Sequence, residues 1–556
     1  MRYAEEGLHP MVQKARESLY EGRVSRREFI RLACLLGTSY GAARFLAACG
    51  APTATTGGGA AAEEIVRGGT LRCASQVPAV DHPMRFSWIY DANVFRHIFE
   101  YLNWYDEQGV THPYLLESYV PNDDLTVWTL NLKQNVTWSN GDALEAEHVK
   151  WSIGQWLDPD VGSSTLGLWE GFLTSDGVEV VGAHTIKMNM DAPILAVAEQ
   201  LTHYAAPILH PTFDGDCTSG NNPGTGYMTL DEYIEGEKAR IVKRDDYWDM
   251  GADGKPLPYL DAMEWYSHGD DQAAGVAMLK SGQVESIYDV NIDNFLAIKD
   301  DANLRVIKTP TSSTRVGRFR VDLDPWTDNR VRMAVKKCQD RQKILDNSYF
   351  GQGDIGFDTH AAPSHPEFAP MDDIPYDPEG AKALLEEAGM SDLSFDIAVG
   401  TGWSDIVAFA ETLQEDAKAA GISVTLDTMP NSAYWDVWTE AAVGITTWAN
   451  RPLAVMVLPL AYIADSEGNP VPWNESRWVD EEFSALLKTA QGTFDLEARR
   501  GIMKDIQRIQ SERGSVFIPF FKPVFRAYTN NVRGASGHPQ NYNTEWREAW
   551  IEPASG

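Results

Sequence analysis

The sequence predicts an α/β fold, and the region from Asp377 to Trp448 gives the clearest signal. Helical patterns there alternate with short apolar strands, and the chain's 556 residues allow two to four domains at roughly 150 residues each. Such alternation is typical of a parallel or mixed sheet covered by helices. The expected order is strand 393–399, helix 406–420, strand 422–426, helix 432–441 and the strand GITTW at 444–448.

The helix that opens this region is predicted from its two ends and from one apolar face. Asp377 is a good N-cap, and Pro378 suits the first helical position. Gly389 then ends the helix. The apolar side chains between these ends are spaced for one helical face: Ala381, Leu384, Leu385 and Ala388.

Three other segments have clear periodicity. Residues Val127–Lys133 alternate as in a half-buried strand, and Glu145–Leu157 follows with helical spacing. Near the C-terminus, Asp495–Arg513 predicts a long helix, and the SVFIPFF stretch after it predicts one buried strand.

The first fifty residues resemble a bacterial export signal. Arg26 and Arg27 precede Glu28 and Phe29 as in a twin-arginine signal, and the apolar run that follows is too short to cross a bilayer. Leu46-Ala47-Ala48-Cys49 resembles the lipobox of bacterial lipoproteins. We therefore expect residues 1–48 to be a cleaved signal, Cys49 to be lipidated and residues 49–66 to be a flexible tether. The protein would then be periplasmic or extracellular and held on the cytoplasmic membrane by its lipid.

Charge and cysteine spacing exclude several classes of function. The formal net charge of −33 argues against nucleic-acid binding, which needs clustered cations. None of the five cysteines forms a C-x-x-C pair, and the histidines are too sparse to define a metal site. We expect no cofactor and no metal. Outside the leading segment, Cys73, Cys217 and Cys338 allow at most one disulfide, and buried free thiols are the alternative.

Several stretches together resemble the family 5 solute-binding proteins of bacterial ABC importers. Their order and spacing carry the resemblance more than any one motif does. The matching stretches are Pro113–Ile153, Gly224–Gly251, Leu279–Ser286 and Asp328–Leu345, followed by the α/β region and SVFIPF. In this family Gly224 and Gly226 would permit a tight backbone.

The resemblance implies a two-lobed periplasmic-binding-protein fold of the large class II type, with mixed sheets and helices on both faces. Lobe 1 is expected to span 67–310, with an extra subdomain at about 100–215. Lobe 2 would cover 311–513, and 514–556 would return to lobe 1. The two chain crossings are expected near Pro310 and Gly514.

The resemblance also implies that the protein is a monomeric binding component rather than an enzyme. It would capture a peptide or peptide-like molecule, anionic and opine-like ones included, between two closing lobes and deliver it to ABC permease and ATPase subunits. An oligosaccharide carrier is an alternative, which the 18 tryptophans favour. A secreted hydrolase with paired carboxylates is a third hypothesis.

Two loops that follow predicted strands are candidate ligand contacts, because ligands of such sheets bind beyond the carboxyl ends of strands. Trp403 lies in the first loop, and Trp448, Asn450 and Arg451 lie in the second. In peptide-binding members the second loop holds an Asp that grips a free amino group. Arg451 would instead suit a carboxylate, a phosphate or a polyhydroxylated group. The alternative is that Arg451 pairs with one of the chain's many acidic residues.

Trp88 and Tyr90 lie where the family's first lobe approaches its ligand, so they are candidate stacking residues. For each of these aromatic residues, and for Trp403 and Trp448, core packing is at least as good an expectation, and Trp448 is the best candidate among them. Tyr434 and Trp435 are expected to lie on a helix and to be packed.

Overall fold

The computed structural model describes residues 65–106, 111–465, 467–540 and 544–553. Contacts divide the chain into two compact units, with the chain passing between them after Thr309 and after Pro523. The first unit holds the described residues up to Thr309 and from Val524 onward, and the second unit is Pro310–Pro523. The predicted export signal with Arg26 and Arg27, and the lipidation site Cys49, lie outside the described residues.

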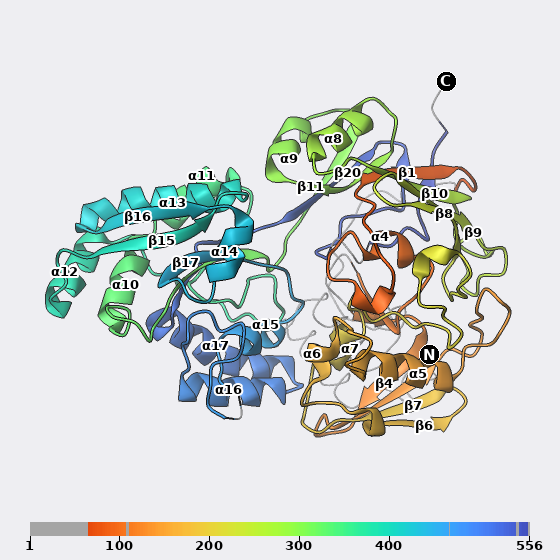
Figure 1. Ribbon diagram of the computed structural model, residues 1–556, viewed down its shortest axis with the longest axis horizontal. Coiled ribbons are helices and arrows are strands. Elements are labelled where there is room, and N and C mark those ends of the chain that lie inside the picture. Colours follow the sequence, from red (N-terminus) through yellow and green to blue (C-terminus); the bar gives the residue numbers. More distant parts are fainter. Residues whose placement is uncertain (1–64, 107–110, 466, 541–543, 554–556) are drawn as a thin grey trace, which may run out of the picture. The chain divides into compact units, whose positions relative to one another are not determined.

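The first unit is organised around a mixed seven-stranded sheet, seen in Figure 1 at the strands labelled β1, β8, β9, β10, β11 and β20. Strand β1 is parallel to both β10 and β11, whereas β20 is antiparallel to β11 and β12. Alternating or continuous burial of apolar residues such as Leu71, Cys73 and Trp265 makes this sheet part of the core. In spatial order the strands are β12 (Leu304–Thr309), β20 (Val524–Thr529), β11 (Ser286–Val290), β1 (Thr70–Ser75), β10 (Ala262–Ser267), β9 (Lys238–Lys243) and β8 (Met228–Ile234).

A second, four-stranded antiparallel sheet lies within the residues expected to form the extra subdomain. Its strand β5 confirms the period-2 pattern at 127–133, because Trp128, Leu130 and Leu132 are buried and their neighbours are less so. Helix α5 packs on β6 and β7, as the helical spacing at 145–157 predicted. The bounds are β4 (Leu116–Pro121), β5 (Val127–Leu132), β7 (Thr185–Asn189), β6 (Val178–Gly182) and α5 (Ala146–Leu157).

The remaining elements of the first unit are short. Gly224 and Gly226 lie against the backbone of His97 and Ile98, where an added Cβ would stand 2.1 Å from the Ile98 carbonyl oxygen and 2.3 Å from that of His97. This close approach explains both glycines. The helices are α4 (Ala92–Phe95), α6 (Leu166–Trp169), α7 (Val197–Gln200), α8 (Gln272–Lys280) and α9 (Ile292–Ile298), and the paired strands are β2 (Asn103–Tyr105) with β3 (Thr111–Pro113) and β21 (Val532–Arg533) with β22 (Trp550–Ile551).

The second unit has its own mixed sheet, which confirms the predicted alternation of strands and helices. Strand β15 is parallel to β16 and β17, and β13 is antiparallel to β17. In spatial order the strands are β14 (Asp354–Ile355), β19 (Phe520–Phe521), β13 (Thr314–Phe319), β17 (Val443–Trp448), β15 (Ser394–Gly400) and β16 (Ser423–Met429), with β18 (Val516–Phe517) also paired to β13.

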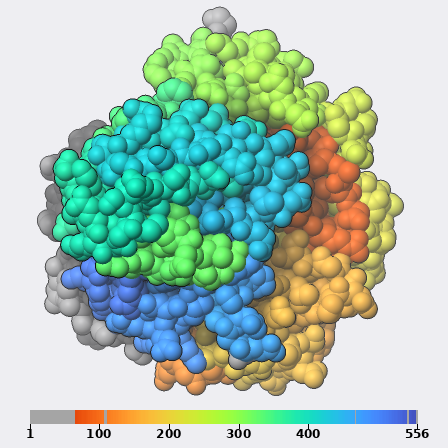
Figure 2. All heavy atoms as spheres, turned by 60° about the vertical axis from the view of Figure 1, so that its left-hand side comes forward, coloured from red at the N-terminus to blue at the C-terminus, as the bar shows by residue number. Residues whose placement is uncertain are grey.

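Helices cover the sheet of the second unit. Helix α13 packs on β15 and β16, and α11 packs on α13 (Figure 1). The segments of this unit that are coloured teal to cyan form one exposed face of it (Figure 2). The helices are α10 (Asn329–Lys337), α11 (Arg341–Tyr349), α12 (Pro378–Ala388), α13 (Ser404–Ala417), α14 (Asn431–Val437), α15 (Ala454–Ala461), α16 (Glu481–Gln491) and α17 (Leu496–Arg513).

The ends of α12 are as the sequence predicts. The Asp377 carboxylate accepts a hydrogen bond from the amide of Gly380, Pro378 is the first helical residue, and Gly389 ends the helix with φ of 71°. Helix α17 likewise matches the long helix expected before SVFIPFF.

The SVFIPFF stretch differs from the prediction of a single strand. It forms two short strands, β18 and β19, because Pro519 between them has no amide proton to donate to a ladder. Both strands pair with β13 in the second unit. The chain therefore leaves that unit after Pro523, later than the crossing expected near Gly514.

Two further properties concern the described residues as a whole. Cys73, Cys217 and Cys338 are buried free thiols. Among the helices of the described ranges, none combines the length and the apolar character that crossing a bilayer requires.

Candidate functional site

Trp448 is the last residue of β17 and is fixed by a buried carboxylate. Only 6% of the residue is exposed, and its indole nitrogen donates to Glu475 Oε1 at 3.1 Å. Its ring meets His360 edge-on at 5.0 Å and the half-exposed Trp473 at 5.8 Å. Trp448 therefore combines a core position with one aromatic neighbour that reaches the surface.

Asn450 is held by the first residues of the second unit. Its side-chain oxygen accepts from the amide of Ser312 at 2.8 Å and lies 2.9 Å from the Ser312 hydroxyl. Because the backbone amide can only donate, the orientation of the Asn450 amide group is fixed. Its buried Nδ2 has no hydrogen-bond acceptor within the described residues, so a donor is left over at this position.

Arg451 is half-buried, and its guanidinium forms no ion pair with any residue that the structure describes. Its side chain donates to the carbonyl of its own neighbour Asn450 at 3.2 Å, and no carboxylate of the described residues lies within 4.0 Å of it. Pairing with an acidic neighbour, the alternative drawn from the sequence, is therefore not found in this part of the chain. The remaining N–H groups form a planar donor fork that suits an anion.

Two buried histidines support the same loop. His365 Nε2 lies 3.0 Å from the Arg451 carbonyl oxygen, and His360 Nδ1 lies 3.0 Å from the Tyr462 hydroxyl. Burial, together with the nearby His365 and Arg451, lowers the pKa of His360 to about 3. His360 is therefore neutral at physiological pH, and Arg451 is the cation of this loop.

Trp403 lies at the start of α13, in the first candidate loop. Its ring contacts Tyr434 and Trp435 edge-on, at 6.0 and 5.6 Å. Tyr434 is buried on α14 as expected, but Trp435 is 41% exposed, so the prediction that it is packed is wrong. Its position on the outer face of a two-turn helix explains the exposure.

A buried ionic cluster beside both loops could not be found from the sequence. Arg315 on β13 makes two hydrogen bonds to Asp405, at 2.8 and 2.9 Å, and also contacts Thr447. Lys522 Nζ lies 2.9 Å from the same carboxylate. Burial alone would raise the pKa of Asp405, but the two cations hold it well below its usual range. Asp405 lies two residues beyond Trp403, and Thr447 directly precedes Trp448.

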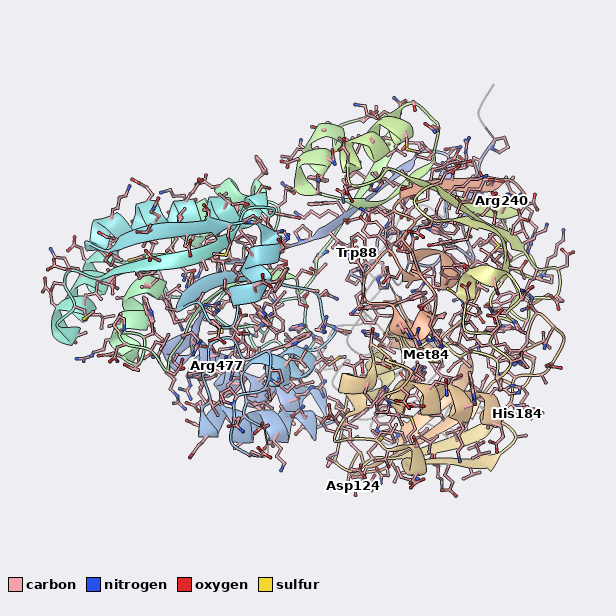
Figure 3. The ribbon with its side chains drawn as sticks, viewed as in Figure 1. Met84, Trp88, Asp124, His184, Arg240 and Arg477 are labelled. Carbon is pink, nitrogen blue, oxygen red and sulfur yellow. The ribbon has the colours of Figure 1, made fainter. Side chains whose placement is uncertain are left out.

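In the first unit, Trp88 and Tyr90 border a pocket of about 540 Å³. Trp88 is 46% exposed, whereas Tyr90 is buried, and their rings meet edge-on at 4.5 Å. Figure 3 shows Trp88 on the first unit. The pocket lies beyond the carboxyl ends of β1, β10 and β11, where ligands of such sheets bind.

The lining of this pocket is acidic. Four aspartates contribute to it, and no Lys, Arg or His of the described residues does. Asp289 accepts from Gln272 at 3.1 Å and from the Tyr90 hydroxyl at 3.4 Å. Burial and the facing Asp289 raise the pKa of Tyr90 well above its usual value, so its hydroxyl stays protonated. The four acidic residues are Asp270, Asp271, Asp289 and Asp293.

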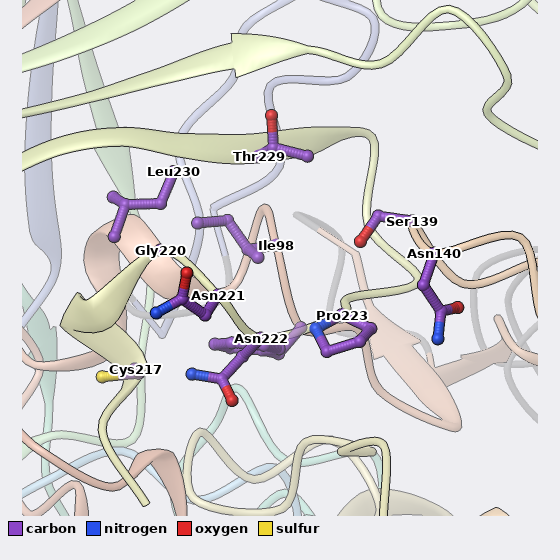
Figure 4. A pocket seen from close by; sticks show the side chains of 11 residues that line it. Ile98, Ser139, Asn140, Cys217, Gly220, Asn221, Asn222, Pro223, Thr229 and Leu230 are labelled. Atoms are coloured by element: carbon purple, nitrogen blue, oxygen red, sulfur yellow. The ribbon is translucent and has the colours of Figure 1, made fainter. Parts of the chain in front are cut away.

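Another cavity of the first unit, of about 220 Å³, is lined chiefly by the loop 217–223 and by Ile98, Phe99 and Ser139 (Figure 4). None of the residues predicted to bind ligand lines it. No group of three or more metal-binding side chains is found in the ranges that the structure describes.

The profile of the bacterial extracellular solute-binding proteins, family 5, matches residues 110–458, which is more than half of the chain. The chain belongs to this family. Within it, the chain is similar to the glutathione-binding protein GsiB of Salmonella paratyphi A (strain ATCC 9150 / SARB42), with 23% identity over 476 residues that cover 80% of this chain and 88% of GsiB.

Solved structures show the same fold. HbpA2 from Haemophilus parasuis superposes with a TM-score of 0.76 at 21% identity and covers 87% of this chain and 100% of its own. AgaA from A. tumefacien R10, solved in complex with agropinic acid, gives a TM-score of 0.70 at 19% identity and covers 87% and 99%. The expected two-lobed periplasmic-binding-protein fold of family 5 is thereby confirmed.

Proposed function

We propose that this family 5 protein captures a peptide-like solute that carries both a cationic and an anionic group, for delivery to an ABC permease and its ATPase. Proteins of this family are solute-binding components of ABC importers and are periplasmic or extracellular. In this proposal the protein binds and releases its solute without making or breaking a bond in it.

The observation that carries the proposal is that the Arg451 guanidinium has no carboxylate partner among the described residues, in a chain with a net charge of −33. An arginine without a carboxylate partner in the described part of so acidic a chain is a good candidate to bind an external anion. Trp448 and Asn450 flank it, the indole as an apolar wall and the amide as a further donor. We assign the anionic group of the solute to this loop.

The acid-lined pocket of the first unit, considered by itself, favours a cationic ligand group. Its aspartates favour a positive charge, and the exposed ring of Trp88 can add a cation–π contact of roughly 0.5–2 kcal/mol. A peptide or an opine carries both kinds of group. Among the proteins named above, GsiB is by name a glutathione-binding protein, and AgaA was solved in complex with agropinic acid.

Native mass spectrometry of the purified full chain tests this function. We expect a bound small molecule that dissociates on activation, and saturable binding of glutathione or agropinic acid where the retained solute has been removed. A protein that retains nothing, and binds neither compound nor a panel of short peptides, would contradict the proposal.

An oligosaccharide carrier is the alternative within the same class, and the exposed tryptophans 88, 435 and 473 are its support. Retention of a neutral sugar would favour it over a zwitterionic solute. The hydrolase hypothesis predicts turnover of a chromogenic glycoside or peptide, whereas saturable binding without turnover is expected of a carrier.

The cellular placement of the protein is part of the same proposal. We propose export through the twin-arginine signal at Arg26 and Arg27, lipidation at Cys49 and function as a monomer. The order of the two motifs in the sequence supports this placement.

A further inference from the structure

The chain enters the second unit at Pro310 and leaves it at Pro523, and these two segments are hydrogen-bonded to each other. The Thr311 hydroxyl donates to the Lys522 carbonyl oxygen at 2.5 Å, and the Lys522 amide donates to the Ser313 carbonyl oxygen at 2.7 Å. Thr311 and Ser313, which follow one crossing, are thus bonded to Lys522, which precedes the other, inside the second unit.

Ser312 ties this junction to the loop that carries Arg451. The Arg451 amide donates to the Ser312 hydroxyl at 2.9 Å, and the Ser312 amide donates to Asn450 Oδ1 at 2.8 Å. The hydroxyl's single proton has two acceptors, Asn450 Oδ1 and the Arg451 carbonyl oxygen, both at 2.9 Å. Ser312 is only 3% exposed, so these bonds are shielded from water.

The other candidate loop is tied to the other crossing. Lys522, next to Pro523, forms its ion pair with Asp405, two residues beyond Trp403. Arg315 extends the link from Asp405 to Thr447. Each candidate ligand loop is therefore bonded to a segment through which the chain passes between the units.

We propose that Ser312 is a positioning residue that couples the Asn450–Arg451 loop to the segment by which the chain enters the second unit. A change in the hydrogen bonds of one of these two segments then changes those of the other. The inference rests on the proposed function only in assigning a solute to that loop. Through this coupling, contact of a solute with Arg451 would alter the backbone hydrogen bonds of the segment by which the chain enters the second unit.

Hydrogen exchange of the full-length protein, read by mass spectrometry at residues 310–314 and 448–453, tests the coupling. Ser312→Ala removes the acceptor of the Arg451 amide, and we expect that amide to exchange at least tenfold faster. Ser312→Thr keeps the hydroxyl and should restore protection. Asn450→Ala tests the coupling in the opposite direction and should accelerate exchange of the Ser312 amide by a similar factor. This variant also tests the proposal if Ser312→Ala does not fold.

Ser313→Ala is the matched control, because no hydrogen bond of its hydroxyl is found among the described residues. It should leave exchange at both segments unchanged. Unchanged exchange in Ser312→Ala and Asn450→Ala, or equal acceleration in Ser313→Ala, would overturn the coupling.

Native mass spectrometry of the same variants separates this inference from the proposed function. We expect the fraction that retains solute to fall at least threefold in Ser312→Ala and to recover in Ser312→Thr. A wild-type protein that holds no solute and does not bind glutathione would count against the proposed function, while the exchange rates would still decide whether Ser312 couples loop and crossing.

Discussion

The indole nitrogen of Trp448 donates to Glu475 Oε1 at 3.1 Å, and the other oxygen of that carboxylate accepts from Arg318 at the same distance. One buried glutamate thus holds the ring at the end of β17 and the guanidinium on β13. Both Arg318 and Glu475 are almost fully buried, so neither charge is solvated when the other is removed.

Glu475→Gln is expected to destabilise the second unit strongly. The change leaves Arg318 without its charged partner, and breaking a buried pair costs about 3–5 kcal/mol. Chemical denaturation followed by tryptophan fluorescence measures the loss. Glu440→Gln, which alters an exposed pair with Arg320 and Arg477, should cost far less stability, because solvent screens exposed ion pairs. Equal effects of the two changes would contradict this account.

Arg451→Ala is expected to weaken solute binding at least tenfold, because it removes the donors assigned to the anionic group. The melting temperature should hardly change, since the guanidinium makes no ion pair with any described residue. Titration calorimetry with glutathione or the identified solute measures the affinity. Arg508→Ala, at an exposed arginine of α17, is the control. An unchanged dissociation constant in Arg451→Ala would remove Arg451 from the site.

Trp88→Ala is expected to weaken binding of a cationic solute roughly threefold to thirtyfold, the range of a cation–π contact. Folding should be little affected, because the ring is half-exposed. Quenching of tryptophan fluorescence would follow the titration. Met250→Ala removes an equally exposed apolar side chain of the same unit outside the pocket and should have no effect. Loss of affinity in both variants would point to a general surface effect instead.

The stability of the first unit is expected to fall as the pH rises from about 4.5 to 7. Burial raises the pKa of Glu100 from its ordinary 4.5 to about 7, although hydrogen bonds from Tyr114 and Tyr247 oppose the rise. A carboxyl group whose pKa is raised on folding contributes fully to the free energy of unfolding at a pH below its unfolded pKa. That contribution, here up to about 3 kcal/mol, is lost as the pH rises through the folded pKa.

Glu100→Gln removes this titration. Its melting temperature relative to wild type should therefore be higher at pH 7.5 than at pH 5, as differential scanning calorimetry would show. Glu179→Gln, at an exposed glutamate of the same unit, should show no such change between the two pH values. A difference that stays constant with pH would mean that Glu100 does not titrate in this range.

Cys49→Ser is expected to release the protein from membranes, because it removes the thiol to which the lipid would be attached. Fractionation of cells, with immunodetection of the membrane and soluble fractions, measures the effect. Cys34→Ser changes the other cysteine of the leading segment and should leave the distribution as it is. Persistent membrane association of Cys49→Ser would show that the anchor lies elsewhere.

Local features of the fold could be predicted from the sequence where a few neighbouring residues decide them. Asp377, Pro378 and Gly389 set the ends of α12, and alternation of apolar residues identified β5 and β15. The prediction of one strand over SVFIPFF was wrong. It rested on the continuous apolar run and did not consider that Pro519 has no amide proton to donate to a neighbouring strand.

The candidate site was predictable only in part, because its bonds join distant residues. The position of Trp448 and Arg451 after a strand could be read from the local pattern. Ser312 lies 138 residues before Asn450, and Asp405 lies 90 residues after Arg315. No periodic pattern in the sequence identifies residues that are hydrogen-bonded or ion-paired over such separations. The acidic pocket likewise arises because β1, β10 and β11 place three separate loops at one edge of the sheet.

The position of β20 has a consequence for how the protein is made. This strand is translated after the whole of the second unit, yet it lies between β11 and β12, which are synthesised more than two hundred residues earlier. Until it arrives, β12 has no partner in the sheet, whereas every strand of the second unit has already been translated. A chain that stopped before Val524 would therefore hold every strand of the second unit's sheet, whereas β12 would stay detached from the rest of the first sheet.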